Sequence, residues 1–93
     1  MKRVEAKVYG VVQGVNFRHY TQQTVNRLPQ VTGWIRNEPD RTVKVVAEGP
    51  EASLQQLVEW LHIGSPHGRV DKVDVVWSEA TGEFSGFKVR WYG

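Results

Sequence analysis

The short segment VQGVNFR, residues 12–18, contains residue types suited to binding an anionic group. It follows an alternating apolar segment and precedes a helical pattern, so we expect a loop that leads from a strand into a helix. The first amides of a helix have no intrahelical acceptor and lie at the positive end of its dipole. Gly10 and Gly14 let the backbone approach a ligand and bend so that N–H groups converge. The guanidinium of Arg18 matches two phosphate oxygens, so the segment indicates a phosphate-binding loop.

The same residues also have an ordinary structural interpretation. Gly14 can be a turn residue, and Arg18 a solvated charge in the first helical turn, where a cation opposes the helix dipole. A second polar segment, GWIRN at residues 33–37, ends a strand with Asn37 just before a turn. Asparagine at such a place commonly bonds the local backbone. In a split βαβ sheet Asn37 can instead face the first loop, and spacing alone leaves both interpretations open.

Hydrophobic patterns predict the elements that would position these residues. Apolar residues alternate in five segments, which predicts strands near residues 4–9, 31–37, 42–48, 73–78 and 87–92. Helical spacing predicts one helix from Phe17 to Leu28 and a second that starts near Glu51 and ends before Gly64. The predicted class is therefore an α+β fold, a ferredoxin-like split βαβ sandwich. Its two helices cover one face of a mixed, mostly antiparallel sheet.

Length and composition limit the classes of function. Ninety-three residues, 40% hydrophobic and 24% charged, predict a single globular domain over residues 1–93. A net charge of +2 favours anionic ligands slightly, and the absence of cysteine excludes disulfides, thiolate metal sites and cysteine nucleophiles. His19, His62 and His67 lack ligand spacing, so we expect surface or packing roles and no metal site. No targeting or membrane-spanning segment is predicted, which favours a cytoplasmic monomer.

Taken together, GVVQGVNFR and GWIRN resemble the acylphosphatase family, with VAEG and GSPHGRV around the second helix as further matching segments. The resemblance implies hydrolysis of a carboxyl-phosphate anhydride to a carboxylate and inorganic phosphate, without metal, cofactor or covalent intermediate. It implies that Arg18 binds the phosphoryl oxygens and that Asn37 holds the attacking water. The loop amides that would bind phosphate with Arg18 belong to Gly14, Val15, Asn16, Phe17 and Arg18 itself. The resemblance also implies that Gln13 supports this loop and takes part in no chemical step.

The segment PDRT departs from this family pattern. Family members commonly have glycine at the position of Arg41, where a positive φ is required. A left-handed arginine costs about 1 kcal/mol, so either the turn is strained or Pro39 selects another turn geometry. Asn37 lies four residues before Arg41, so a changed turn geometry can alter its position.

A non-catalytic module is the alternative: the same fold would bind phosphate, carbamoyl phosphate or RNA. Four tryptophans and the segment SGFKVRW resemble part of an RNA-recognition motif, but that motif belongs on the third strand and this segment is on the last. We expect core packing for most of the aromatic residues. The preferred prediction is an acylphosphatase acting on a small-molecule acyl phosphate, with no nucleic-acid or membrane partner.

Overall fold

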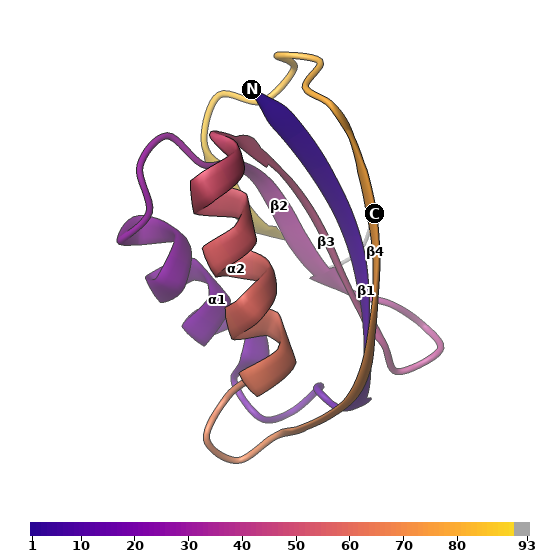
Figure 1. The fold of residues 1–93 in the computed structure, drawn as a ribbon. Coiled ribbons are helices and arrows are strands. Elements are labelled where there is room, and N and C mark those ends of the chain that lie inside the picture. Colours follow the sequence, from indigo (N-terminus) through magenta and orange to yellow (C-terminus); the bar gives the residue numbers. More distant parts are fainter. Residues whose placement is uncertain (91–93) are drawn as a thin grey trace.

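The computed structural model describes residues 1–90, and its elements follow the predicted order. They are β1 (Lys2–Val11), α1 (Phe17–Asn26), β2 (Thr32–Asn37), β3 (Val43–Gly49), α2 (Glu51–Ile63), β4 (Arg69–Glu79) and β5 (Phe87–Arg90). Both helices pack on one face of a five-stranded sheet, as Figure 1 shows. The predicted ferredoxin-like α+β fold is confirmed.

The order of the strands brings two distant segments to one end of the sheet. The order is β4-β1-β3-β2-β5, with all neighbours antiparallel except β2 and β5. Val8 in β1 pairs with Val43 in β3, which also pairs with Asn37 in β2. The loop after β1 and the turn between β2 and β3 therefore leave the sheet at the same end.

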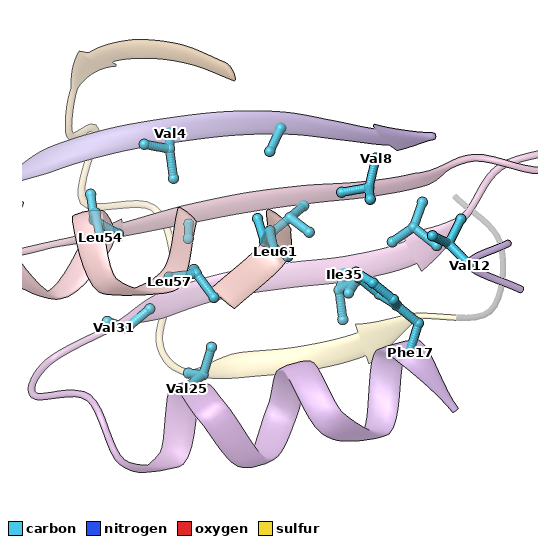
Figure 2. Packing of buried hydrophobic residues seen from close by; sticks show 14 residues of the cluster. Val4, Val8, Val12, Phe17, Val25, Val31, Ile35, Leu54, Leu57 and Leu61 are labelled. Carbon is cyan, nitrogen blue, oxygen red and sulfur yellow. The ribbon is translucent and has the colours of Figure 1, made fainter. Parts of the chain in front are cut away.

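The core lies between the sheet and the two helices (Figure 2). Leu54, Leu57 and Leu61 of α2 are fully buried, as their helical spacing predicts. Phe17, the first residue of α1, is 2% exposed, and its ring centroid lies 5.3 Å from that of Trp60. Full burial of such a side chain contributes about 1.5–3 kcal/mol. Phe17 therefore anchors the start of α1, directly before Arg18.

Strands β1 and β4 are longer than predicted. β1 continues to Val11, and β4 begins at Arg69. The register of the two strands shifts between Tyr9 and Gly10. A Cβ atom at Gly10 would collide with the Arg69 carbonyl oxygen, so the strands can stay paired there because glycine has no side chain. The missing side chain of Gly10 therefore admits a neighbouring strand, and its predicted approach to a ligand stays a prediction. The predicted last strand extends to Tyr92, and its final two residues lie outside the described part.

The tryptophans are less buried than predicted. Trp60 packs against the core as expected. Trp34 lies on the sheet face away from the helices, where the guanidinium carbons of Arg36 and Arg90 are 4.8 and 5.2 Å from its ring centroid. Trp77 is 42% exposed. Core packing is thus the wrong prediction for Trp34 and Trp77, and Trp91 lies outside the described residues.

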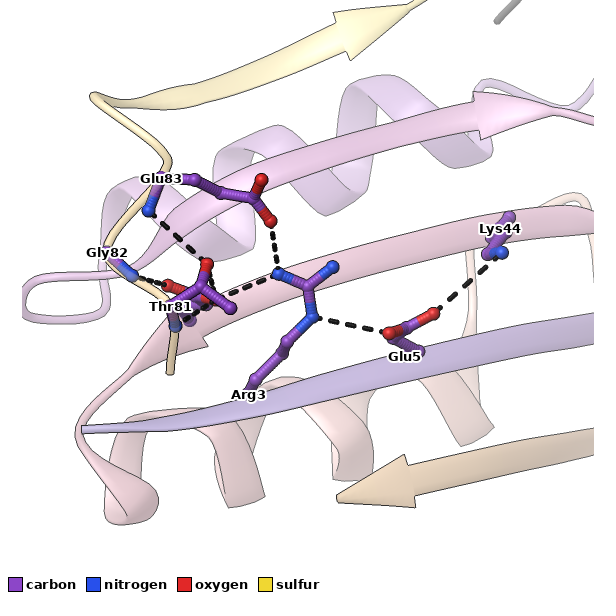
Figure 3. A network of polar contacts seen from close by, with 7 residues as sticks. Arg3, Glu5, Lys44, Thr81, Gly82 and Glu83 are labelled. Atoms are coloured by element: carbon purple, nitrogen blue, oxygen red, sulfur yellow. Dashed lines mark hydrogen bonds and ion pairs between the residues drawn. The ribbon is translucent and has the colours of Figure 1, made fainter. Parts of the chain in front are cut away.

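A buried carboxylate fastens the β4–β5 connection to the end of β3 (Figure 3). Glu48, 4% exposed, accepts hydrogen bonds from Nη1 of Arg3 and from the N–H groups of Thr81 and Gly82, each at 2.9 Å. The Thr81 hydroxyl donates a further bond at 2.9 Å. Burial alone would raise the pKa of Glu48, but these donors outweigh it and hold the pKa at about 2.

Glu48→Gln is expected to lower the free energy of unfolding at pH 7 by about 3 kcal/mol, because it removes one partner of a buried charge pair. The folded-state pKa of Glu48, about 2, lies below its ordinary value of 4.5. Its stabilisation is therefore complete above pH 4.5 and is lost as the pH falls through the folded-state value. Urea unfolding at pH 7, 5 and 3 measures this: the gap between the two proteins should narrow in acid.

Glu79→Gln is the matched control, because Glu79 makes an exposed ion pair with Lys2 at 3.0 Å. Its effect should be much smaller at every pH. A gap for Glu48→Gln that stays constant between pH 7 and 3 contradicts the prediction.

Candidate active site

The loop between β1 and α1 has a strongly bent backbone. Gly14 has φ 74°, and Asn16 has φ 60° with ψ 27°, so both are left-handed. The first backbone bond of the helix runs from the Tyr20 N–H to the Asn16 carbonyl oxygen at 3.1 Å. The amides before Tyr20 therefore lack intrahelical acceptors. Asn16 makes no side-chain cap, and the first turn of α1 contains no acidic residue. This helix start can accept an anion.

Gln13 connects this loop to the turn between β2 and β3. Its Nε2 donates to the carbonyl oxygens of Glu38 at 2.8 Å and Thr42 at 2.9 Å. Glu38 directly follows Asn37, so these bonds fix the loop relative to the end of β2. This geometry supports the expected role of Gln13 as a loop support.

Asn37 ends β2 on the side of the sheet that faces the helices. It shares this side with Gly33 and Ile35, because alternate residues of a strand point the same way. Its Oδ1 is buried and has no hydrogen-bond partner within residues 1–90. A buried acceptor left unpaired costs about 1–3 kcal/mol, so such an atom is suited to accepting a bond from a bound molecule.

Arg18 is half-buried in the first turn of α1 and reaches towards β5. Its Nη1 donates to the carbonyl oxygen of Arg90 at 3.0 Å. Arg90 pairs with Arg36 of β2, the neighbour of Asn37 in sequence. The guanidinium is therefore tethered near the end of β2, and the interpretation of Arg18 as a merely solvated charge is wrong. Gln13, Arg18 and Asn37 thus converge on one end of the sheet.

The segment between α2 and β4 packs closely against the loop between β1 and α1 and against Phe17. A Cβ atom at Gly68 would lie 2.8 Å from the Val11 carbonyl oxygen and 3.2 Å from Cγ2 of Val15. A Cβ atom at Gly64 would lie 3.2 Å from the Phe17 ring. Sequence reasoning assigned this segment no role in the site. Its match to the family pattern and its two glycines were the signals in the sequence, and the packing shows that the glycines permit close contact with the loop and with Phe17.

The turn after Asn37 decides between the two geometries considered for Arg41. Arg41 has φ 72°, and its N–H donates to the Glu38 carbonyl oxygen at 3.1 Å. The three residues between Glu38 and Thr42 form a hairpin loop that ends in a left-handed residue. Arg41 therefore occupies the strained conformation. Beside it, the bonds from Lys7 and Thr42 lower the pKa of the Asp40 carboxyl to about 2.

Arg41→Gly is expected to raise the free energy of unfolding by about 0.5–1 kcal/mol, because relief of the left-handed strain exceeds the added freedom of the unfolded chain. Urea unfolding measures the gain. Gln30→Gly is the matched comparison, because Gln30 has φ 58° in another turn and should respond similarly. A loss of stability in Arg41→Gly contradicts the prediction.

The histidines lie on the surface and form no metal site within the described residues. His19, His62 and His67 are exposed, as expected of surface residues. Within residues 1–90, no group of three or more His, Asp or Glu side chains is arranged to hold a metal ion. No helix in this range is long and apolar enough to cross a bilayer.

Comparison with known proteins identifies the family. The acylphosphatase family model matches residues 4–89. The chain belongs to the acylphosphatase family. An acylphosphatase of Salinibacter ruber is 51% identical over 89 residues, which cover 96% of this chain and 93% of the relative.

Solved acylphosphatase structures agree with this assignment. The crystal structure of the Bacillus subtilis acylphosphatase aligns with a TM-score of 0.91 and 34% identity, over 97% of this chain and 99% of that one. An acylphosphatase structure from Coxiella burnetii aligns with a TM-score of 0.87 and 35% identity, over 96% and 92% of the two chains. The predicted family resemblance and the prediction of an enzyme of this family are confirmed. Family and fold support acyl phosphate hydrolysis, and the binding-module alternative is not favoured.

Proposed function

We propose that this acylphosphatase hydrolyses acyl phosphates at the end of the sheet where Gln13, Arg18 and Asn37 converge. The observation that carries the proposal is the position of Asn37. Its Oδ1 is buried without a hydrogen-bond partner among residues 1–90, and it lies at the strand end that Gln13 connects to the loop. An anion-binding helix start and a buried acceptor on one sheet end are the two parts that hydrolysis of a phosphoryl group requires.

The loop amides of residues 14–18 and the guanidinium of Arg18 bind the phosphoryl oxygens in this proposal. Gly14 and Asn16 are left-handed, and a backbone bend of this kind can bring successive N–H groups to a common point. The guanidinium of Arg18 presents N–H donors in a planar fork that matches two phosphoryl oxygens. Hydrogen bonds from fixed donors stabilise the charge on the phosphoryl oxygens in the transition state.

Asn37 positions the attacking water. Its Oδ1 accepts a hydrogen bond from the water, whose oxygen then attacks phosphorus. The bond between phosphorus and the acyl oxygen breaks, its electron pair leaves with the carboxylate, and the water's proton passes to a phosphate oxygen. No general acid is needed, since the leaving carboxylic acid has a pKa of about 4. Phosphoryl transfer of this kind depends mainly on positioning and charge stabilisation.

The remaining predictions complete the proposal. The reaction requires no metal ion or cofactor, and residues 1–93 act as one domain. A cytoplasmic monomer without a nucleic-acid partner remains the prediction for the protein in the cell.

Phosphate release tests the proposal directly. Purified protein should release phosphate from acetyl phosphate at an unchanged rate in the presence of a chelator. It should turn over phenyl phosphate poorly, because the phenol that leaves has a pKa of about 10. Absence of turnover with acetyl, benzoyl and carbamoyl phosphate contradicts the proposed function, and loss of turnover with the chelator contradicts its metal-free form.

A further inference from the structure

A cleft of about 280 Å³ lies beside the proposed phosphate site. The end of β1 and the following loop form one side, with Gly10, Val11, Val12 and Gln13, and Arg41 of the β2–β3 turn forms the other. Gln13 lines this cleft and is also the residue that fixes the loop to the turn. A substrate whose phosphoryl group is bound by the loop can therefore extend its acyl group along this cleft.

The charge of Arg41 is not neutralised by its neighbours. Asp40 is paired with Lys7 at 2.8 Å, and Glu38 is paired with Arg36 at 3.4 Å. In the part of the chain that the structure describes, no carboxylate lies within 4.0 Å of the Arg41 guanidinium nitrogens. The side chain is exposed and borders the cleft. The cleft therefore has a cation at its outer wall.

The backbone at Arg41 gives a second, independent observation. A residue with φ 72° is held in the conformation that glycine adopts most easily. The left-handed conformation is unfavourable for a residue with a side chain, so the local geometry of the turn does not explain an arginine at this position. Backbone outliers of this kind occur preferentially at ligand-binding sites.

We propose that Arg41 determines specificity by binding a second anionic group on the acyl part of the substrate. The preferred substrates are then acyl phosphates whose acyl group carries a distal carboxylate or phosphate. A guanidinium binds either group through two parallel hydrogen bonds. This inference rests on the proposed function, since it assigns the substrate class of the same site.

Two substrates of similar length test the inference. Succinyl phosphate carries a distal carboxylate, and butyryl phosphate ends in a methyl group. The measured quantity is the ratio of their kcat/KM values at low ionic strength, where an exposed ion pair is least screened. Arg41→Gln should lower this ratio about three- to fivefold, the size expected for an exposed pair. Arg41→Lys should retain most of the preference because it keeps the charge.

Two further variants separate charge from other effects. Arg41→Gly removes both the charge and the backbone strain, so it should lower the ratio as much as Arg41→Gln. Arg27→Gln removes an exposed positive charge at the far end of α1 and should leave the ratio unchanged. Urea unfolding midpoints show that each variant is folded. A third substrate with a distal phosphate ester shows which of the two anionic groups Arg41 prefers.

The possible outcomes are distinct. An equal ratio in the natural sequence and in Arg41→Gln overturns the inference, as does an equal fall of the ratio in Arg27→Gln. Failure of the natural sequence to hydrolyse any acyl phosphate, including acetyl phosphate, is instead a failure of the proposed function.

Discussion

Replacement of Arg18 by alanine is expected to lower kcat/KM for acetyl phosphate by about 10³- to 10⁵-fold, the range that an arginine contributes to charge stabilisation in phosphoryl transfer. The change removes the only side-chain cation that we assign to the phosphoryl oxygens. It also removes the bond to the Arg90 carbonyl. Each hydrogen bond lost costs about 0.5–1.5 kcal/mol, which is small beside the unfolding free energy of about 5–15 kcal/mol typical of native proteins, so the variant should remain folded.

Initial rates and inhibition by inorganic phosphate measure this prediction. Phosphate should inhibit the Arg18→Ala variant much more weakly, because in the proposed mechanism the same guanidinium binds the product. Arg18→Lys keeps a charge but loses paired donation, so its rate should fall between the two. Arg27→Ala is the control on the same helix. A rate for Arg18→Ala within about tenfold of the natural sequence rejects the assigned role, because it leaves at most about 1.4 kcal/mol to the guanidinium.

Asn37→Ala is expected to reduce kcat by about 10²- to 10³-fold, since a misplaced nucleophile or one lost transition-state contact costs about this much. In the proposed mechanism Asn37 contacts the water, and the loop and Arg18 bind the phosphoryl group, so KM should change little. Stability should also change little. The substitution removes a buried acceptor that has no partner among the described residues, so it leaves no other polar group unpaired.

Steady-state kinetics with acetyl phosphate separate these effects. Asn26→Ala, at the exposed end of α1, is the control for loss of an asparagine. A rise in KM with unchanged kcat shows that Asn37 binds the phosphoryl group, which contradicts its role in positioning water. Far-UV circular dichroism and urea unfolding establish that the variant keeps its fold.

The order of the elements and the face covered by the helices could be predicted from the sequence. They follow from the two-residue alternation of apolar residues in strands and their period of about 3.6 residues in helices. Arg18 could be placed at a helix start for the same reason. Local patterns left the convergence of Arg18 and Asn37 open, and only the family resemblance implied it, because it depends on the pairing of Val8 and Asn37 with Val43 across the sheet. Such a register is a property of distant segments that local patterns do not contain.

Contacts between distant residues explain the other differences. The sequence places Glu48 as a polar residue of a strand. Its burial and its hydrogen bonds could not be predicted, because its partners Thr81 and Gly82 lie more than thirty positions away. Gly10 reads as part of a ligand loop, and only the position of Arg69 shows that it admits a strand. The conformation of Arg41 had two candidate geometries, and the backbone of the turn decides between them.

The two hydrogen bonds donated by Gln13 join the loop and the turn into one cooperative unit. Either segment can open only when both carbonyl acceptors are released, so slow fluctuations of the two should be synchronous. Amide hydrogen exchange would then report one common opening for both segments, and entry of substrate and departure of carboxylate would share that single motion.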